Sequence, residues 1–275
     1  MLSKYETTTY EQKTQALREV MQEIALAGLY RGGFFEKAAF YGGTCLRIFH
    51  QLPRFSEDLD FSLLAPQDDF KLAPYFEAVE NEFQSLGVDI VITQKVKTNQ
   101  TAIESAFLKN TTQIFDITAH GNQAVKIKFE VDTAPPLGFK TEDNLLLEPF
   151  SFYVKCFALP DLFAGKMHAL LFRRWKNRVK GRDWFDFEWY IRKNIPMNLE
   201  HFNLRALQSG DINKALLEDE FKELLLNKIA DVDVRSAKED IQRFILEPNA
   251  LDIWSTKYFS AVAGKIKITQ NSHVD

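Results

Sequence analysis

The chain has 275 residues, 45% hydrophobic and 26% charged, which is an ordinary composition for a globular protein with one large domain or two smaller ones. Its formal net charge of −4 argues against a protein whose whole surface coats nucleic acid, although it allows a local basic patch. The N-terminus is too polar for a signal peptide, and no apolar run approaches the roughly 20 residues that span a bilayer, so we expect a cytoplasmic protein with no membrane contact.

The patterns of cysteine, histidine and glycine exclude several further classes of protein and of site. Cys45 and Cys156 form no C-x-x-C pair, and the five histidines are scattered without zinc-ligand spacing, so neither a disulfide framework nor a zinc site is indicated. The chain also lacks the P-loop motif and the G-x-S-x-G elbow of serine hydrolases.

The first half of the chain mixes helical and strand patterns. An apolar stripe predicts a helix over residues 14–27 that ends at Gly28, and a short helix follows the Gly42-Gly43-Thr44 turn over residues 44–51. A helix over 69–86 ends at Gly87, and strands are predicted over 58–64, 88–97, 103–108 and 124–132. This order predicts an α+β fold with a mostly antiparallel or mixed sheet.

The second half reads as helical. Helical spacing recurs over residues 162–175, 182–193, 204–207, 212–229, 236–244 and 254–263. We place a domain boundary within residues 151–159, which divides the chain into an α+β domain over 1–155 and a helical domain over 156–275.

Two carboxylates on one strand are the most informative feature. Asp58 and Asp60 are two positions apart, so they project from the same face, while Leu59, Phe61 and Leu63 face the core. Mg²⁺ takes oxygen ligands and is usually held by one or two carboxylates together with the phosphates of a nucleotide. The pair follows a glycine turn that can approach phosphate. Together, the turn and the two carboxylates indicate a site for a Mg²⁺–nucleoside triphosphate. The plainer alternative is a surface strand with solvated acids.

A second strand supplies a third acidic candidate. Over 125–132 the polar residues Lys126, Lys128, Glu130 and Asp132 share one face of the strand. A third carboxylate can complete a metal site or act as general base for an incoming hydroxyl. Spacing does not separate Glu130 from Asp132, and the alternative is again a half-exposed strand.

Cationic residues are concentrated further along the chain. Lys166 lies on a helix that we expect Asp161 to cap, and Arg173 is about two turns later on the same face. The run from residue 173 to 182 adds a basic strip that includes Arg174, Lys176 and Arg178. Such a strip can bind RNA phosphates, and it can equally be a solvated helix end.

Two acids follow the basic strip. Asp183 has the default role of capping the next helix. Asp186 lies among aromatic residues, so we expect it to have a cationic partner, either Lys166 or an arginine.

These segments together resemble the AbiEii/AbiGii-type toxin family, nucleotidyltransferases of the DNA polymerase β-like superfamily. The first motif is Gly42-Gly43-Thr44 with Leu46-Arg47, and the second and most specific is the R-x-S-x-D-x-D-F sequence over 54–61. The third is the strand with Glu130, followed by Pro135-Pro136. The fourth combines Lys166 with the sequence over 180–186.

The resemblance implies a nucleotidyltransferase-like mixed sheet with flanking helices, followed by a helical C-terminal domain that contributes Lys166 and Asp186 to the cleft. It favours Glu130 over Asp132 as the third carboxylate. The implied metal ligands, for Mg²⁺ or Mn²⁺, are Asp58, Asp60 and Glu130. The implied catalytic residues are these three with Lys166 and Asp186. The implied nucleotide-binding residues are Gly42, Gly43, Thr44, Arg47, Ser56, Lys166 and Asp183, and the acceptor-binding residues are Arg173, Arg174, Lys176 and Arg178.

The implied activity is transfer of a nucleotide from an NTP to an acceptor, expected to be RNA at the 3′ end of tRNA. Such proteins serve as the toxin of a toxin–antitoxin or phage-defence pair, so a cognate antitoxin is the expected partner. Two alternatives stay open: the same chemistry on a small molecule or protein, and a nucleotide-binding module without catalysis.

Overall fold

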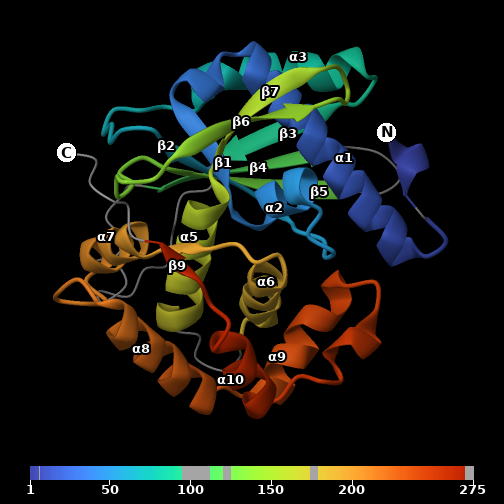
Figure 1. Cartoon of the computed structure of the whole chain (residues 1–275). Helices are drawn as coiled ribbons and strands as arrows, with labels where there is room; N and C mark the ends of the chain where they lie inside the picture. Colours follow the sequence, from blue (N-terminus) through green and yellow to red (C-terminus); the bar gives the residue numbers. More distant parts are fainter. Residues whose placement is uncertain (6, 95–111, 120–124, 174–178, 270–275) are drawn as a thin grey trace. The chain divides into compact units, whose positions relative to one another are not determined.

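A computed structural model describes residues 1–5, 7–94, 112–119, 125–173 and 179–269 of the chain. These residues form two compact units (Figure 1). Unit 1 contains Met1–Gln51, Phe55–Pro135 and Thr141–Phe157, and unit 2 contains Leu52–Arg54, Pro136–Lys140 and Ala158–Asp275. The short segment that carries Arg54 therefore belongs to unit 2, although the strand that follows it belongs to unit 1.

Unit 1 is built on a mixed sheet that has seven strands within the described residues, in the order β3-β4-β5-β2-β1-β7-β6. Two pairs, β2–β5 and β1–β7, are parallel, and the other neighbours are antiparallel. The strand bounds are β1 Ala38–Tyr41, β2 Asp58–Leu63, β3 Ile90–Gln94, β4 Thr112–Ala119, β5 Val125–Asp132, β6 Thr141–Leu146 and β7 Phe152–Phe157.

The pleat of β2 and β5 separates a core face from a polar face as the sequence predicts. Leu59, Phe61 and Leu63 are buried, and Val125, Ile127, Phe129 and Val131 are buried on β5. The intervening side chains of β5 are exposed or half-buried, and Asp58 and Asp60 are half-buried. Because each strand has its apolar residues on one face, the acidic residues gather on the other.

The helices of unit 1 are α1 Tyr10–Arg31, α2 Gly42–His50 and α3 Phe76–Ser85. The prediction that Gly28 ends the first helix is wrong, because α1 continues to Arg31. Gly28 instead lies where α1 crosses α3: a Cβ at this position would be 2.6 Å from the Cα of Val79. The glycine allows close helix packing here and does not act as a cap.

Unit 2 is helical, with α5 Leu159–Phe172, α6 Gly181–Arg192, α7 Leu199–Ser209, α8 Glu218–Ala230, α9 Val234–Ile241 and α10 Thr256–Ala263. A two-stranded parallel sheet joins β8 Met197–Asn198 to β9 Ile268–Thr269. Helix α5 packs against α6 and α7, and α6 packs against α9 (Figure 1). The expected helical second half is therefore confirmed.

Two capping predictions in unit 2 are wrong. The N-cap of α5 is Ala158, and Asp161 lies inside the first turn, where its carboxylate accepts hydrogen bonds from the Lys140 N–H and the Asn198 side chain. The N-cap of α6 is Lys180, and Asp183 again lies inside the first turn. Each carboxylate stabilises the N-terminus of its helix electrostatically, but neither residue is the N-cap.

Four strands of the sheet are absent from the predicted set, namely β1, β4, β6 and β7. The strand predicted over residues 103–108 lies outside the described residues. The mixed sheet with flanking helices and the helical segments that follow it nevertheless agree with the predicted fold class.

Candidate active site

The three candidate carboxylates lie on two neighbouring strands of unit 1. In the parallel β2–β5 pair, Asp58 is opposite Lys128 and Asp60 is opposite Glu130. All four side chains belong to the polar face of the sheet and are half-buried. The register therefore places the third carboxylate beside the D-x-D pair, as the sequence predicts.

Gly42 brings the start of α2 against one of these carboxylates. It has a φ of +84°, and a Cβ at this position would be only 2.5 Å from Oδ2 of Asp60. Helix α2 begins at Gly42, and its N-cap, Tyr41, makes no side-chain cap hydrogen bond. The first N–H groups of a helix lack partners within the helix and attract anions, so this turn suits a phosphate group.

The other first- and second-motif residues hold the framework around the carboxylates. The buried Thr44 hydroxyl donates to the carbonyl oxygen of Asp58, which ties α2 to β2. The Arg47 guanidinium pairs with Glu19 at 2.8 Å. The carbonyl of Ser56 accepts a hydrogen bond of 3.1 Å from the Gln22 side chain. The predicted contacts of Gly43, Thr44, Arg47 and Ser56 with nucleotide stay predictions.

Lys128 contributes a cation to the acidic face. Its ammonium forms an ion pair with Oε1 of Glu130. Burial alone would lower the pKa of Lys128, but Glu130, with Asp58 and Asp60 acting at longer range, outweighs burial and raises this pKa. Lys128 is therefore charged and partly neutralises the three carboxylates.

The donor set suits a hard divalent cation, since all three candidate ligands are carboxylates. Within the described residues, no three His, Cys, Asp or Glu side chains are gathered in a way that could hold a metal ion. Oε1 of Glu130 is paired with Lys128, so a metal that takes this oxygen displaces the ammonium, and a metal that takes the other oxygen has the ammonium as a near neighbour. The three carboxylates suit the metal in donor chemistry and lie on neighbouring strands, but in this arrangement the described side chains are not gathered into a coordinating cluster.

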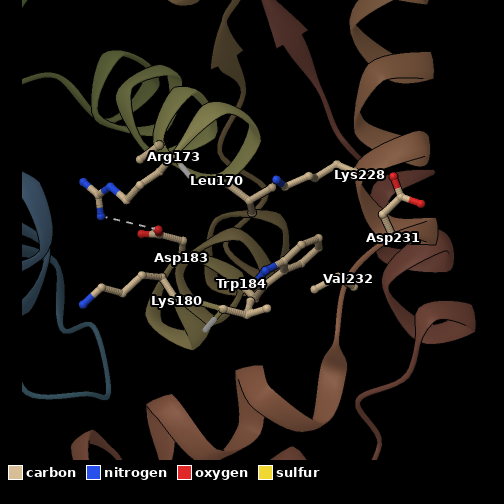
Figure 2. Close-up of a pocket in the computed structure, with 10 residues that line it drawn as sticks. Leu170, Arg173, Lys180, Asp183, Trp184, Lys228, Asp231 and Val232 are labelled. Carbon is tan, nitrogen blue, oxygen red and sulfur yellow. Dashed lines mark ion pairs between the residues drawn. The ribbon is translucent and has the colours of Figure 1, made fainter. Parts of the chain in front are cut away.

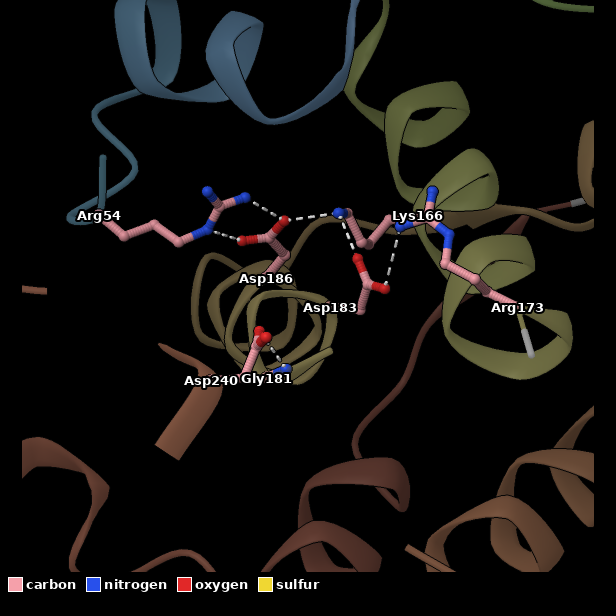
Figure 3. Close-up of polar contacts among 7 residues, drawn as sticks. All are labelled: Arg54, Lys166, Arg173, Gly181, Asp183, Asp186 and Asp240. Atoms are coloured by element: carbon pink, nitrogen blue, oxygen red, sulfur yellow. Dashed lines mark hydrogen bonds and ion pairs between the residues drawn. The ribbon is translucent and has the colours of Figure 1, made fainter. Parts of the chain in front are cut away.

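A row of alternating charges runs through unit 2 (Figure 3). Nε of Arg54 is 2.6 Å from Oδ1 of Asp186, and the second guanidinium contact, from Nη2 to Oδ2, is also 2.6 Å. The Lys166 ammonium is 2.8 Å from both Asp186 and Asp183, and Arg173 is 3.6 Å from Asp183. The predicted pairing of Asp186 with Lys166 or an arginine is confirmed, with both cations present.

Asp186 is the buried centre of this row. Its side chain is 0% exposed, and that of Arg54 is 2% exposed. Burial alone would raise the pKa of Asp186, but Arg54 and Lys166 outweigh it and hold this pKa below its usual value. Asp186 is ionised and bidentately bound, which makes it an anchor for both cations; a catalytic role stays a prediction.

A pocket of about 300 Å³ lies beside the same row in unit 2 (Figure 2). Leu170, Trp184 and Val232 supply its apolar lining, and Asp183 links it to the ion row. Its remaining lining residues include the cations Arg173, Lys180 and Lys228. The acceptor-binding candidates Arg174, Lys176 and Arg178 lie outside the described residues.

Sequence reasoning gave no individual role to Arg54 or Gly181. Both belong to the matched motifs, which was the available signal. A Cβ at Gly181 would be 1.9 Å from the carbonyl oxygen of Ala237, so this glycine permits the close contact between α6 and α9. Its N–H donates to Asp240 at 3.0 Å (Figure 3).

The fold matches that of known nucleotidyltransferases. A Helicobacter pylori structure described as a nucleotidyltransferase has a TM-score of 0.50 and 20% identity, over 91% of this chain and 92% of that one. JHP933 from Helicobacter pylori has a TM-score of 0.52 and 18% identity, over 91% and 88%. The nucleotidyltransferase toxin MenT4, Rv2826c of Mycobacterium tuberculosis H37Rv, has a TM-score of 0.55 and 16% identity, over 97% and 89%.

The family itself follows from the sequence. Residues 24–258 match the model of the family described as nucleotidyl transferase AbiEii toxin, type IV TA system. The chain therefore belongs to this family, which confirms the resemblance, and it is a nucleotidyltransferase toxin of a type IV toxin–antitoxin system. Membership implies an NTP substrate and an antitoxin partner. A search of curated proteins gave no match. No helix within the described ranges is long and apolar enough to cross a membrane.

Gly42→Ala is expected to reduce nucleotide transfer by about 100-fold, because the added Cβ displaces Asp60, which is a predicted metal ligand. Gly87→Ala is the matched control: Gly87 has a φ of +72°, and a Cβ there would have no neighbour within 4 Å. Both variants carry the same kind of backbone strain, about 1–2 kcal/mol. Initial rates of transfer and urea unfolding separate the two effects. Wild-type rates in Gly42→Ala would show that Asp60 tolerates displacement.

Proposed function

We propose that the chain is a Mg²⁺-dependent enzyme of the cytoplasm that transfers a nucleotide from an NTP to RNA, at the 3′ end of tRNA. The observation that carries this proposal is the register of β2 and β5, which aligns Asp60 with Glu130 beside the N-terminus of α2. Mn²⁺ is the alternative ion, and phage defence is the proposed biological setting. An antitoxin partner restrains the toxin.

The proposed chemistry assigns a task to each group and two tasks to Glu130. Asp58, Asp60 and Glu130 would hold the metal, which supplies positive charge to the phosphates when bound. The acceptor hydroxyl attacks the α-phosphorus, the bond to pyrophosphate breaks, and the hydroxyl proton passes to a carboxylate, for which Glu130 is the candidate. Lys166 would counter the charge on the leaving pyrophosphate. Its present contacts with Asp183 and Asp186 keep its ammonium in one position.

The destination of a radiolabel tests the reaction and the acceptor together. With an NTP labelled at the α-phosphate, the proposal predicts label at the 3′ end of RNA, and with label at the γ-phosphate it predicts label in pyrophosphate. Label on protein or on a small molecule would support the same chemistry on a different acceptor. Binding of NTP without any label transfer would identify a nucleotide-binding module.

The basic strip of residues 173–182 is proposed to bind the acceptor. Changing Arg174, Lys176 and Arg178 together to Glu is expected to weaken RNA binding and to flatten its log–log salt dependence by about 0.7 for each lost phosphate contact. NTP affinity should be unchanged, since the triphosphate is assigned to other residues. Fluorescence anisotropy over a salt series measures both ligands. Equal RNA affinity of the variant and the wild type at low salt would assign this segment to a solvated surface.

A further inference from the structure

Lys128 has a place in the carboxylate site that none of the proposed catalytic roles uses. Its Cα is opposite that of Asp58, and its ammonium pairs with Glu130. Asp58 and Asp60 also attract it electrostatically. Lys128 thus pairs with one of the three residues that the proposed function gives to a metal ion and is attracted by the other two.

We propose that Lys128 is the internal counter-ion of this site, which occupies Glu130 until metal and nucleotide arrive together. The inference rests on the proposed function, because it requires Asp58, Asp60 and Glu130 to be metal ligands. Lys128 then couples metal binding to nucleotide binding: metal alone binds weakly, and metal with triphosphate binds well.

Charge and burial support this coupling. The side chains of Lys128 and Glu130 are 32% and 29% exposed, so solvent screens their ion pair only in part. A divalent cation that takes Glu130 must displace the ammonium from Oε1 or accept it as a near neighbour, and either change opposes metal binding. The negative charge of a triphosphate attracts both the divalent cation and the Lys128 ammonium. Bound nucleotide therefore removes the repulsion that opposes metal binding. Thermodynamic linkage makes this effect reciprocal. If bound nucleotide raises the affinity for metal by some factor, bound metal raises the affinity for nucleotide by the same factor.

Lys126 provides a matched comparison on the same strand. It lies two residues before Lys128 on the same face of β5, and its ammonium pairs with Asp116 of β4 at 2.7 Å. This partner belongs to the strand on the other side of β5 from β2. A purely structural ion pair of this kind has no reason to affect metal affinity.

The experiment measures free Mn²⁺ by electron paramagnetic resonance, with and without an NTP analogue that has a methylene group between the α- and β-phosphates. For Lys128→Met we expect Mn²⁺ alone to bind more tightly, on the order of tenfold, and the strengthening by the analogue to shrink by a similar factor. Lys126→Met should match the wild type in both measurements. Lys128→Arg keeps the charge and should retain most of the coupling, which gives a second readout if Lys128→Met folds poorly.

Two results would overturn the inference. If Lys128→Met equals Lys126→Met with and without the analogue, Lys128 is only a structural ion pair. If Lys128→Met loses Mn²⁺ affinity, the lysine supports the metal and does not compete with it. Wild-type protein that binds no Mn²⁺ even with the analogue, or binding that survives Asp60→Asn, would instead overturn the proposed function, and the inference with it.

Discussion

Asp58→Ala and Asp60→Ala are each expected to reduce nucleotide transfer by at least about 100-fold, because each change removes a carboxylate that positions charge at the reacting phosphate. Both side chains lie on the polar face of β2, away from the buried Leu59 and Phe61, so the fold should persist. Label transfer from an α-labelled NTP measures the first effect, and thermal unfolding checks the second.

Asp143→Ala is the control for this experiment. Asp143 is a carboxylate of the same unit on the edge strand β6, where it pairs with Lys155 at 3.2 Å and is largely exposed. It should keep wild-type transfer. Near-normal transfer by Asp58→Ala would refute the assignment of the D-x-D pair.

Asp186→Asn is expected to destabilise the protein by about 3–5 kcal/mol, because it removes the charge of the carboxylate that binds the buried Arg54 guanidinium bidentately. Urea unfolding measures this loss. A double variant, Arg54→Met with Asp186→Leu, should recover much of the stability, since it removes both buried charges. Asp143→Asn, at an exposed pair, should lose less than about 1 kcal/mol.

The pH dependence of stability follows from the lowered pKa of Asp186. A carboxyl whose pKa is lower in the folded state contributes stability that is fully present above its unfolded pKa of about 3.9. This contribution is lost as the pH falls through the lower folded value. The stability difference between wild type and Asp186→Asn should therefore narrow below about pH 4. A difference that stays constant down to pH 2 would show that Asp186 is not the ionised partner of Arg54.

The part of the candidate site that depends on local periodicity could be predicted from the sequence. Alternation predicted that Asp58 and Asp60 share one face of β2 and that Glu130 lies on the polar face of β5, and the strand register places Glu130 opposite Asp60. On the two strands the side-chain direction follows from strand geometry alone. The two-turn spacing of Lys166 and Arg173 predicted a common helix face. Helix α5 ends at Phe172 and Arg173 is its C-cap residue with extended backbone, yet both cations contact Asp183.

Features that depend on distant parts of the chain were not predictable in the same way. Arg54 and Asp186 are 132 residues apart, and no local pattern specifies which arginine pairs with the buried acid. The close contact of Gly28 with α3 is tertiary and leaves no local pattern in the sequence, so this glycine was interpreted as a helix end. Strand β6 is mostly exposed along its length, so it lacks the alternation that identifies a half-buried strand.

The most direct test of the central claim is the position of a bound metal. Crystals grown with Mn²⁺ and the non-hydrolysable NTP analogue should give an anomalous diffraction peak within coordination distance of the carboxylates of Asp58 and Asp60, with the triphosphate extending toward Gly42. A peak elsewhere on the protein, or a nucleotide bound away from β2 with no metal beside it, would contradict the account.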